Sequence, residues 1–204
     1  MADKVENILE KMTDELLWYQ EENIFSAKQV KKIVKSRRDH EYQLQRKDAN
    51  IGFFLDAIKY ERELDRVKIK RKKAISKSEG GSKSKGADFR HDNGIKRRIM
   101  HLYDRACRKF KQNKLLWKEY LEYLVRTKSL QKLNRTVANA LLTHPGHLDF
   151  WLIAAYSELD MRGNLFSSRN LMLQALRANE DSSEFQLAYL AFEVKFLGKL
   201  MQRR

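Results

Sequence analysis

Apolar residues in the first third of the chain recur at steps of three and four, the period of an amphipathic α-helix. This pattern predicts one helix over residues 3–22 and a third over about 51–74. A second helix with a basic outer face is expected between them. Its start is set at Ser26, because Ser26 and Gln29 have the spacing of a capping box. The positions that carry the three patterns are Val5, Ile8, Leu9, Met12, Leu16 and Tyr19, then Val30, Ile33, Val34, Arg37, Tyr42 and Leu44, then Phe54, Leu55, Ile58 and Leu64.

From about Ile95 the helical pattern resumes, and it repeats itself. Trp117 and Trp151 are 34 residues apart, and the next equivalent position, after a one-residue insertion, is Gln186. Small residues follow the same spacing on the intervening helices, at Ala106, Ala140 and Ala175. Two helices in a period of about 34 residues are typical of an α-solenoid, in which large and small side chains interlock between neighbouring helices.

Composition agrees with an all-α fold. The chain has 204 residues, of which 42% are hydrophobic, enough for one packed domain or two small ones. One proline and eight glycines are too few turn residues for an all-β chain. The single cysteine excludes an intramolecular disulfide framework and a zinc site built from several cysteines. It fits a reducing compartment.

The formal net charge of +15 is concentrated in one stretch, because residues 66–111 hold 17 basic and only 4 acidic side chains. A Gly/Ser/Lys-rich tract from Ser76 to Gly86 lies within it and indicates a flexible linker. The stretch is either a solvated helix end with a linker or a contact for a polyanion such as an RNA or DNA backbone. The candidate nucleic-acid-binding residues are Arg66, Lys68, Lys70, Arg71, Lys72, Lys73, Lys96, Arg97 and Arg98.

No residue set indicates catalysis, a cofactor or a metal. Cys107 is expected to be a small buried hydrophobe. The segment His144 to His147 is expected to be a helix–helix connection, since it offers no full ligand set. No apolar run is long enough to span a membrane, and the N-terminus lacks an apolar signal core. An enzyme, a small-molecule substrate and a membrane partner are therefore not expected.

Two helical-repeat families share the period. The tetratricopeptide pattern requires a glycine that is missing here, whereas Trp117, Tyr120 and Tyr123 are similar to the first helix of the half-a-tetratricopeptide (HAT) repeat, and Tyr103-Asp-Arg105-Ala106 resembles its second helix. Leu124 stands where that repeat usually has Glu. The residues to which this resemblance gives a structural role are Trp117, Tyr120, Trp151, Glu158, Tyr189, Glu193, Ala106, Ala140 and Ala175. Glu158 and Glu193 would be polar links within repeats, not catalytic acids.

The N-terminal segment narrows the resemblance. The run Ile24-Phe25-Ser26-x2-Gln29-Val30-x2-Ile33-Val34-Lys35-x-Arg37-Arg38, followed by Glu41-Tyr42 and later Tyr60-Glu61, is similar to the start of a HAT-repeat family. That family is the sixth U-three small nucleolar RNA-associated type of the UTP series, a component of the small-subunit processome. The resemblance implies a nucleolar, non-catalytic scaffold. It would hold WD-repeat propeller proteins, pre-rRNA and U-three small nucleolar RNA in place for early rRNA processing.

The sequence thus predicts an N-terminal helical docking module over 1–75, a linker over 76–94 and a HAT-repeat α-solenoid over 95–204. Since members of that family carry more repeats, the solenoid is expected to be truncated at its C-terminus. Two alternatives stay open. One is a HAT-repeat scaffold of a splicing or mRNA 3′-end cleavage complex, and the other is a protein whose primary role is to bind RNA backbone through 66–98.

Overall fold

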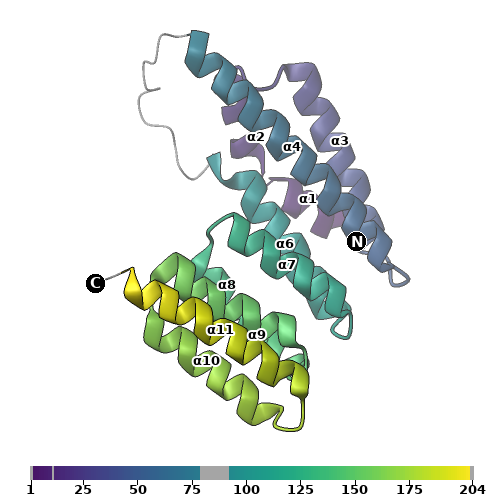
Figure 1. Ribbon diagram of the computed structural model, residues 1–204. Helices are drawn as coiled ribbons and strands as arrows, with labels where there is room; N and C mark the ends of the chain where they lie inside the picture. Colours follow the sequence, from purple (N-terminus) through teal and green to yellow (C-terminus); the bar gives the residue numbers. More distant parts are fainter. Residues whose placement is uncertain (1, 11, 79–91, 203–204) are drawn as a thin grey trace. The chain divides into compact units, whose positions relative to one another are not determined.

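The computed structural model describes residues 2–10, 12–78 and 92–202 (Figure 1). These residues form helices and, within those ranges, no β-strand. The first four helices are α1 (Ala2–Glu10), α2 (Thr13–Glu21), α3 (Ala27–Leu44) and α4 (Ile51–Ser78). The remaining elements are α6 (Gly94–Lys109), α7 (Lys114–Arg126), α8 (Leu130–Thr143), α9 (Leu148–Tyr156), the π-helix η1 (Ser157–Arg162), α10 (Leu165–Ala178) and α11 (Ser183–Met201). The predicted all-α class is confirmed.

The start of α3 is the local detail that the sequence predicted most closely. Ser26 is its N-cap, and its Oγ accepts a hydrogen bond from the Gln29 amide at 3.4 Å while the Gln29 side chain accepts one from the Ser26 amide at 3.1 Å. This capping box satisfies two backbone donors that the first turn leaves without helical partners. The single helix expected over 3–22 is instead two helices, α1 and α2.

Contacts divide the chain into two compact units, Met1–Lys109 and Phe110–Arg204. In the first unit α3 packs against α1, α2 and α4, and α4 packs along α6 (Figure 1). The core includes Tyr19, Ile58, Ile95 and Tyr103, all nearly inaccessible to solvent. The sequence had grouped α6 with the solenoid, whereas its contacts group it with the N-terminal helices. Most of the predicted 76–94 linker lies outside the described residues, and the expected boundary there stays a prediction.

The second unit is built from successive helices that pack on their neighbours. Helix α7 contacts α8 and α9, α9 contacts α8 and α10, and α10 contacts α11 (Figure 1). Aromatic side chains fill this core, with Phe150 and Phe192 fully buried. Ala140 and Ala175 are also fully buried, as expected for small residues that allow close approach of neighbouring helices. The predicted connection between α8 and α9 over 144–147 is confirmed.

One type of hydrogen bond recurs at the starts of α7, α9 and α11, at the spacing that the sequence pattern predicts. The indole Nε1 of Trp117 donates to the Lys111 carbonyl at 2.9 Å, and that of Trp151 donates to the Pro145 carbonyl at 2.8 Å. At the third position Gln186 Nε2 donates to the Glu180 carbonyl at 3.3 Å. In each case the acceptor lies six residues earlier. Gln186 thus makes a hydrogen bond at the same spacing as the two Trp residues, although its side chain is exposed.

A second side chain reaches the same carbonyls from the end of the following helix. His144 Nε2 lies 2.8 Å from the Lys111 carbonyl oxygen, and Asn179 Nδ2 donates to the Pro145 carbonyl at 3.3 Å. His144 and Asn179 are the C-cap residues of α8 and α10. Each pair of helices is thus joined at one end through a shared backbone acceptor, an arrangement the sequence pattern did not indicate.

The one-residue insertion in the repeat coincides with the π-helix η1. Trp117 and Trp151 are 34 residues apart, but the left-handed residues that end the two first helices, Lys128 (φ 55°) and Gly163 (φ 66°), are 35 apart. The extra residue therefore lies between Trp151 and Gly163, where η1 occupies 157–162. A π-helical turn is the usual way for a helix to accommodate one added residue without losing its ends.

Candidate nucleic-acid interface

The predicted basic stretch forms the last turns of α4 and the first turns of α6. Arg66, Lys70, Lys73 and Arg97 are exposed. Arg71, Lys72 and Lys96 are half-buried, whereas Lys68 and Arg98 are only 2% and 8% exposed. The nine candidates therefore differ in how much of their charge a ligand could reach.

Six lysines line one open hollow of about 730 Å³. Residues Ile69 and Ala74 and a single carboxylate, that of Asp92, complete its lining. The six lysines are Lys68, Lys70, Lys72, Lys73, Lys77 and Lys96. We refer to this set as the lysine hollow. Lys77 belongs to it although it was not among the sequence-based candidates, and a helical projection of 66–78 would have placed it one turn beyond Lys73.

Asp92 is the counter-ion of the lysine hollow. Its carboxylate lies 3.0 Å from Lys72 Nζ and 3.7 Å from Lys68 Nζ, and its backbone carbonyl accepts a hydrogen bond from Lys68. Burial alone would raise the pKa of this carboxyl, but the hydrogen bond from Lys72 and the charges of Lys68, Lys72 and Lys96 hold the pKa below its ordinary value. Asp92 is therefore ionised at neutral pH.

Arg71 has a different position. Its Nη1 donates to the Ile24 carbonyl at 2.9 Å and to Gln29 Oε1 at 2.7 Å, and its guanidinium stacks over the Phe25 ring at 5.1 Å. These contacts attach α4 to the segment that leads into α3. Arg71 is thus a structural anchor beside the lysine hollow.

Arg98 belongs to a buried ionic cluster that connects four helices. Its Nε donates to Glu61 Oε1 at 2.8 Å and its Nη2 to Glu41 Oε1 at 3.2 Å. Glu61 also accepts two hydrogen bonds from Arg37, at 2.8 and 2.9 Å, and Glu41 accepts one from Arg105 at 2.7 Å. The cluster consists of Glu15 from α2, Arg37 and Glu41 from α3, Glu61 from α4, and Arg98 and Arg105 from α6.

The cluster is closely balanced, with three acidic and three basic groups. Burial alone would raise the pKa of Glu61, but the adjacent Arg37 and Arg98 hold it below its ordinary value. Tyr19 completes one edge by donating to Glu15 Oε1 at 2.7 Å. A guanidinium paired with two buried carboxylates has little charge left for a ligand, so Arg98 serves the fold of the first unit.

Most of the residues to which the repeat resemblance gives a structural role are buried, but Glu193 pairs between two successive helix pairs and not within one repeat as predicted. Tyr120, Ala106, Ala140 and Ala175 are 0–1% exposed, and Trp117 and Trp151 are 7–8% exposed. Glu158 is buried and pairs with Arg162, one turn further on, at 3.1 Å. Glu193 receives a 2.7 Å hydrogen bond from Arg169 of α10, beside the half-buried Tyr189. The Glu193 pair thus joins α10 to α11, the second helix of one pair to the first of the next.

Cys107 is 2% exposed, and burial together with the nearby Asp104 raises its thiol pKa to about 12. Over the described ranges, three or more His, Cys, Asp or Glu side chains nowhere gather in a way that could hold a metal ion. Nor does any described helix combine the length and apolar character that crossing a bilayer requires.

The structure defines an all-α protein with a helical N-terminal unit and a second unit of repeated helix pairs. Residues 9–98 match the family model for U3 small nucleolar RNA-associated protein 6. The fission yeast Schizosaccharomyces pombe protein of that name is 30% identical over 203 residues, which cover 100% of this chain and 40% of the relative. The human homologue is 26% identical, over a match that covers all of this chain and 33% of the human protein. The Dictyostelium discoideum homologue is also 26% identical, over a match that covers 97% of this chain and 31% of that protein.

The family model and the curated relatives thus relate this chain to proteins named U3 small nucleolar RNA-associated protein 6. The family match covers α2, α3, α4 and the first turns of α6, and therefore most of the buried ionic cluster. The chain spans between 31 and 40% of the length of these curated relatives.

Proposed function

We propose that this chain is part of a non-catalytic scaffold of the small-subunit processome. The observation that carries the proposal is its similarity, over 97–100% of its length, to three proteins named for their association with U3 small nucleolar RNA. In this role the protein holds WD-repeat propeller proteins, pre-rRNA and U3 small nucleolar RNA in position for early processing of the small-subunit rRNA precursor. Its location is the nucleolus.

The helix pairs of the second unit support a HAT-type α-solenoid as the architecture of this scaffold. Three features repeat at 34–35 residues: the side-chain bond to a carbonyl six residues earlier, the left-handed residue after the first helix, and the buried alanine of the second helix. An array of this kind presents extended surfaces to protein partners without performing bond chemistry. The scaffold acts by fixing positions.

RNA contact belongs to the first unit in this proposal. The exposed members of the basic stretch, Arg66, Lys70 and Lys73, together with Lys77, offer ammonium and guanidinium groups to backbone phosphates. The described residues that line the lysine hollow include no aromatic side chain, which favours a contact with the backbone that is independent of base sequence. Partner choice then depends on the helical surfaces, and RNA affinity depends on charge.

Affinity purification of the tagged full-length protein from its own cells, with and without nuclease, tests the proposal. We expect WD-repeat propeller proteins of the processome to be recovered after nuclease treatment. Recovery of splicing or mRNA 3′-end factors would instead assign the protein to another HAT-repeat assembly. Loss of every partner after nuclease treatment would make RNA binding its primary role.

A further inference from the structure

The lysine hollow contains its own anion. Among the described residues that line it, Asp92 is the single acidic one, and both Lys68 and Lys72 direct their ammonium groups toward its carboxylate. Lys70, Lys73 and Lys77 have no ion-pair partner within the part of the chain that the structure describes. The hollow is therefore divided into a neutralised inner part and an outer part that keeps its full positive charge.

We propose that the Asp92 carboxylate occupies an RNA phosphate site in the lysine hollow and that a phosphate of bound RNA displaces it from Lys72. This inference rests on the proposed RNA contact of the first unit. Lys70, Lys73 and Lys77 attract the backbone first, because their charges are exposed. Lys72 then exchanges one oxygen anion for another, so Asp92 lowers RNA affinity without blocking it.

The exposure of the Asp92–Lys72 pair favours such an exchange over a permanent structural ion pair. Its side chain is one-third exposed, and that of Lys72 is 37% exposed, so a phosphate can reach the pair. Lys68 is held in place by other contacts, because Asp65 lies 3.1 Å from its Nζ and the Asp92 backbone carbonyl accepts its hydrogen bond. Displacing the Asp92 carboxylate therefore leaves Lys68 paired and the helix packing unchanged.

A phosphate ligand explains the residue types of the hollow. Lysine ammonium groups act as compact point charges that suit backbone phosphates in any orientation, whereas arginine offers planar recognition. All six cationic residues of the hollow are lysines. The neighbouring arginines, Arg71 and Arg98, are engaged in fixed contacts of the fold. This division favours an RNA backbone over a ligand that needs paired hydrogen bonds.

The experiment compares the chain with its Asp92→Asn variant, using a fluorescein-labelled single-stranded RNA of about 20 nucleotides, longer than common site sizes. Binding is followed by fluorescence anisotropy at several salt concentrations. Asn keeps the shape of Asp and removes its charge. We expect Asp92→Asn to bind RNA about threefold to tenfold more tightly. Its affinity should also fall more steeply with salt, because Lys72 then neutralises a phosphate without setting free a carboxylate charge.

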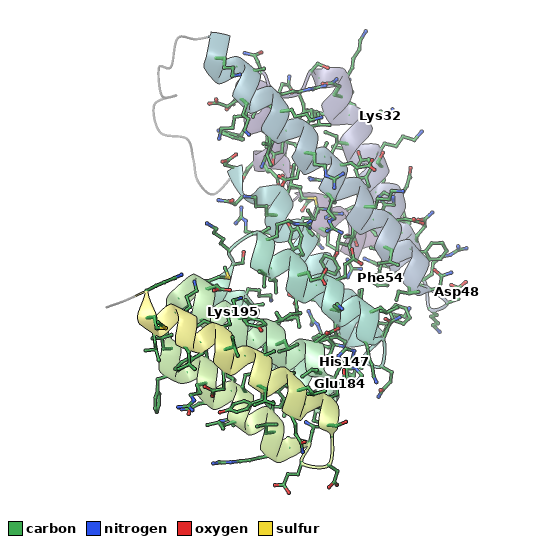
Figure 2. The ribbon with its side chains drawn as sticks, viewed as in Figure 1. Lys32, Asp48, Phe54, His147, Glu184 and Lys195 are labelled. Atoms are coloured by element: carbon green, nitrogen blue, oxygen red, sulfur yellow. The ribbon has the colours of Figure 1, made fainter. Side chains whose placement is uncertain are left out.

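The matched control is Asp48→Asn, which makes the same change in net charge. Asp48 is exposed and precedes the first residue of α4, whereas the lysine hollow lies near the last turns of this 28-residue helix. The two positions are thus separated by the length of the helix, roughly 40 Å. Figure 2 labels Asp48 beside the first turn of α4. Equal tightening by both variants would reduce the effect to net charge and overturn the proposal.

A second pair of variants tests the location. Lys70→Ala/Lys73→Ala/Lys77→Ala should lower RNA affinity at least tenfold, because three phosphate contacts are lost. Lys31→Ala/Lys32→Ala/Lys35→Ala removes three exposed lysines from α3, where Figure 2 shows Lys32 pointing away from the helices, and should have a smaller effect. The reverse order, or preference for a polyglutamate peptide over RNA, would overturn the proposal.

Failure of this inference and failure of the proposed function give different results. A chain that binds no RNA, yet still recovers processome proteins after nuclease treatment, refutes the lysine hollow and retains the scaffold. A chain whose RNA affinity responds to Asp92→Asn but which recovers splicing factors retains the hollow and refutes the processome role. Circular dichroism of each variant confirms that the helices are intact.

Discussion

Six charged side chains enclosed between α2, α3, α4 and α6 explain why the first unit includes α6. Glu61 is central, since it accepts hydrogen bonds from both Arg37 and Arg98. Breaking a buried ion pair on one side leaves an uncompensated charge, which costs far more than an exposed pair is worth. The cluster therefore specifies how these four helices meet.

Replacing Glu61 by Gln should lower the free energy of unfolding by about 3 kcal/mol, because two buried guanidinium groups lose a counter-charge. Glu63→Gln provides the matched control, since Glu63 is exposed on the same helix. Its effect should stay within about 0.5 kcal/mol. Chemical denaturation of both variants measures the difference. Equal effects would mean that the cluster does not stabilise the unit.

The same carboxyl gives a pH dependence with a definite sign. The pKa of Glu61 is lower in the folded chain than its ordinary value of 4.5. Its contribution to stability is therefore fully present above about pH 4.5 and is lost as the pH falls through the folded pKa. The stability gap between the unmodified chain and Glu61→Gln should narrow from pH 7 towards pH 3 in denaturant titrations. A gap that widened on acidification would contradict the assignment.

Cys107 should be almost inert in the folded protein. Burial, with a smaller effect of Asp104, raises the pKa of its thiol to about 12, so the reactive thiolate is about a thousandfold scarcer than for a free cysteine. Because Cys107 is the one cysteine of the chain, any cysteine alkylation that is detected must be at this residue. Alkylation by iodoacetamide, followed by mass spectrometry, should be slow until denaturant is added. Rapid reaction without denaturant would contradict this burial.

At the residue scale the sequence predicted some roles and missed others for a physical reason. Burial of Cys107 followed from its place beside Ala106 on an amphipathic helix. The linear sequence groups Arg98 with the basic stretch, because it does not show that Arg98 of α6 donates a hydrogen bond to Glu61 of α4. The spacing of Arg37 and Glu41, one helical turn apart, was the available signal of a charged inner face.

At the scale of elements, the repeat is defined by polar contacts at helix ends as much as by the apolar core. The bonds from Trp117, Trp151 and Gln186 all reach a carbonyl six residues earlier. The period and the Gln186 equivalence were readable from the sequence, because large side chains must recur wherever helices meet. The π-helix could not be predicted from the sequence, since a one-residue insertion changes the distance between Trp151 and Gln186 in the same way wherever it falls between them.

Deleting Asp160, an exposed residue within η1, should convert the π-helical turn into a continuous α-helix and restore a uniform period. The ion pairs from Lys195 and Lys199 to Asp160 are exposed and contribute little. The control deletes Glu122, an exposed residue of α7, where no extra residue is present to absorb the change. Thermal unfolding by circular dichroism should show a clearly lower midpoint for the Glu122 deletion.

Two results of that comparison bear on the register. A smaller loss for the Asp160 deletion supports η1 as the site of the insertion. A loss as large as that of the Glu122 deletion would place the extra residue elsewhere between Trp151 and Gly163. Figure 2 labels Lys195 of α11, whose ammonium group pairs with Asp160 and lies over the Tyr156 ring. Lys195 therefore contacts both η1 and the end of α9.

At the scale of the whole molecule, the two units carry different structural features. The first unit carries the ionic cluster and the lysine hollow, and the second carries the helix pairs. The sequence predicted an all-α chain, because the scarcity of Gly and Pro argues against an all-β fold and the 3.6-residue period of apolar positions indicates helices. The assignment of α6 to the first unit could not be predicted, since it depends on contacts such as Arg98–Glu61 and Arg105–Glu41, which join residues 37 and 64 positions apart.

The role that we propose for this chain lies in the production of small-subunit rRNA. The most direct test depletes the protein from its own cells and follows rRNA precursors by hybridisation with probes for each cleavage. We expect accumulation of uncleaved small-subunit precursor and loss of mature small-subunit rRNA, with large-subunit rRNA little changed. Normal small-subunit rRNA, accompanied by unspliced or unprocessed mRNA, would contradict it.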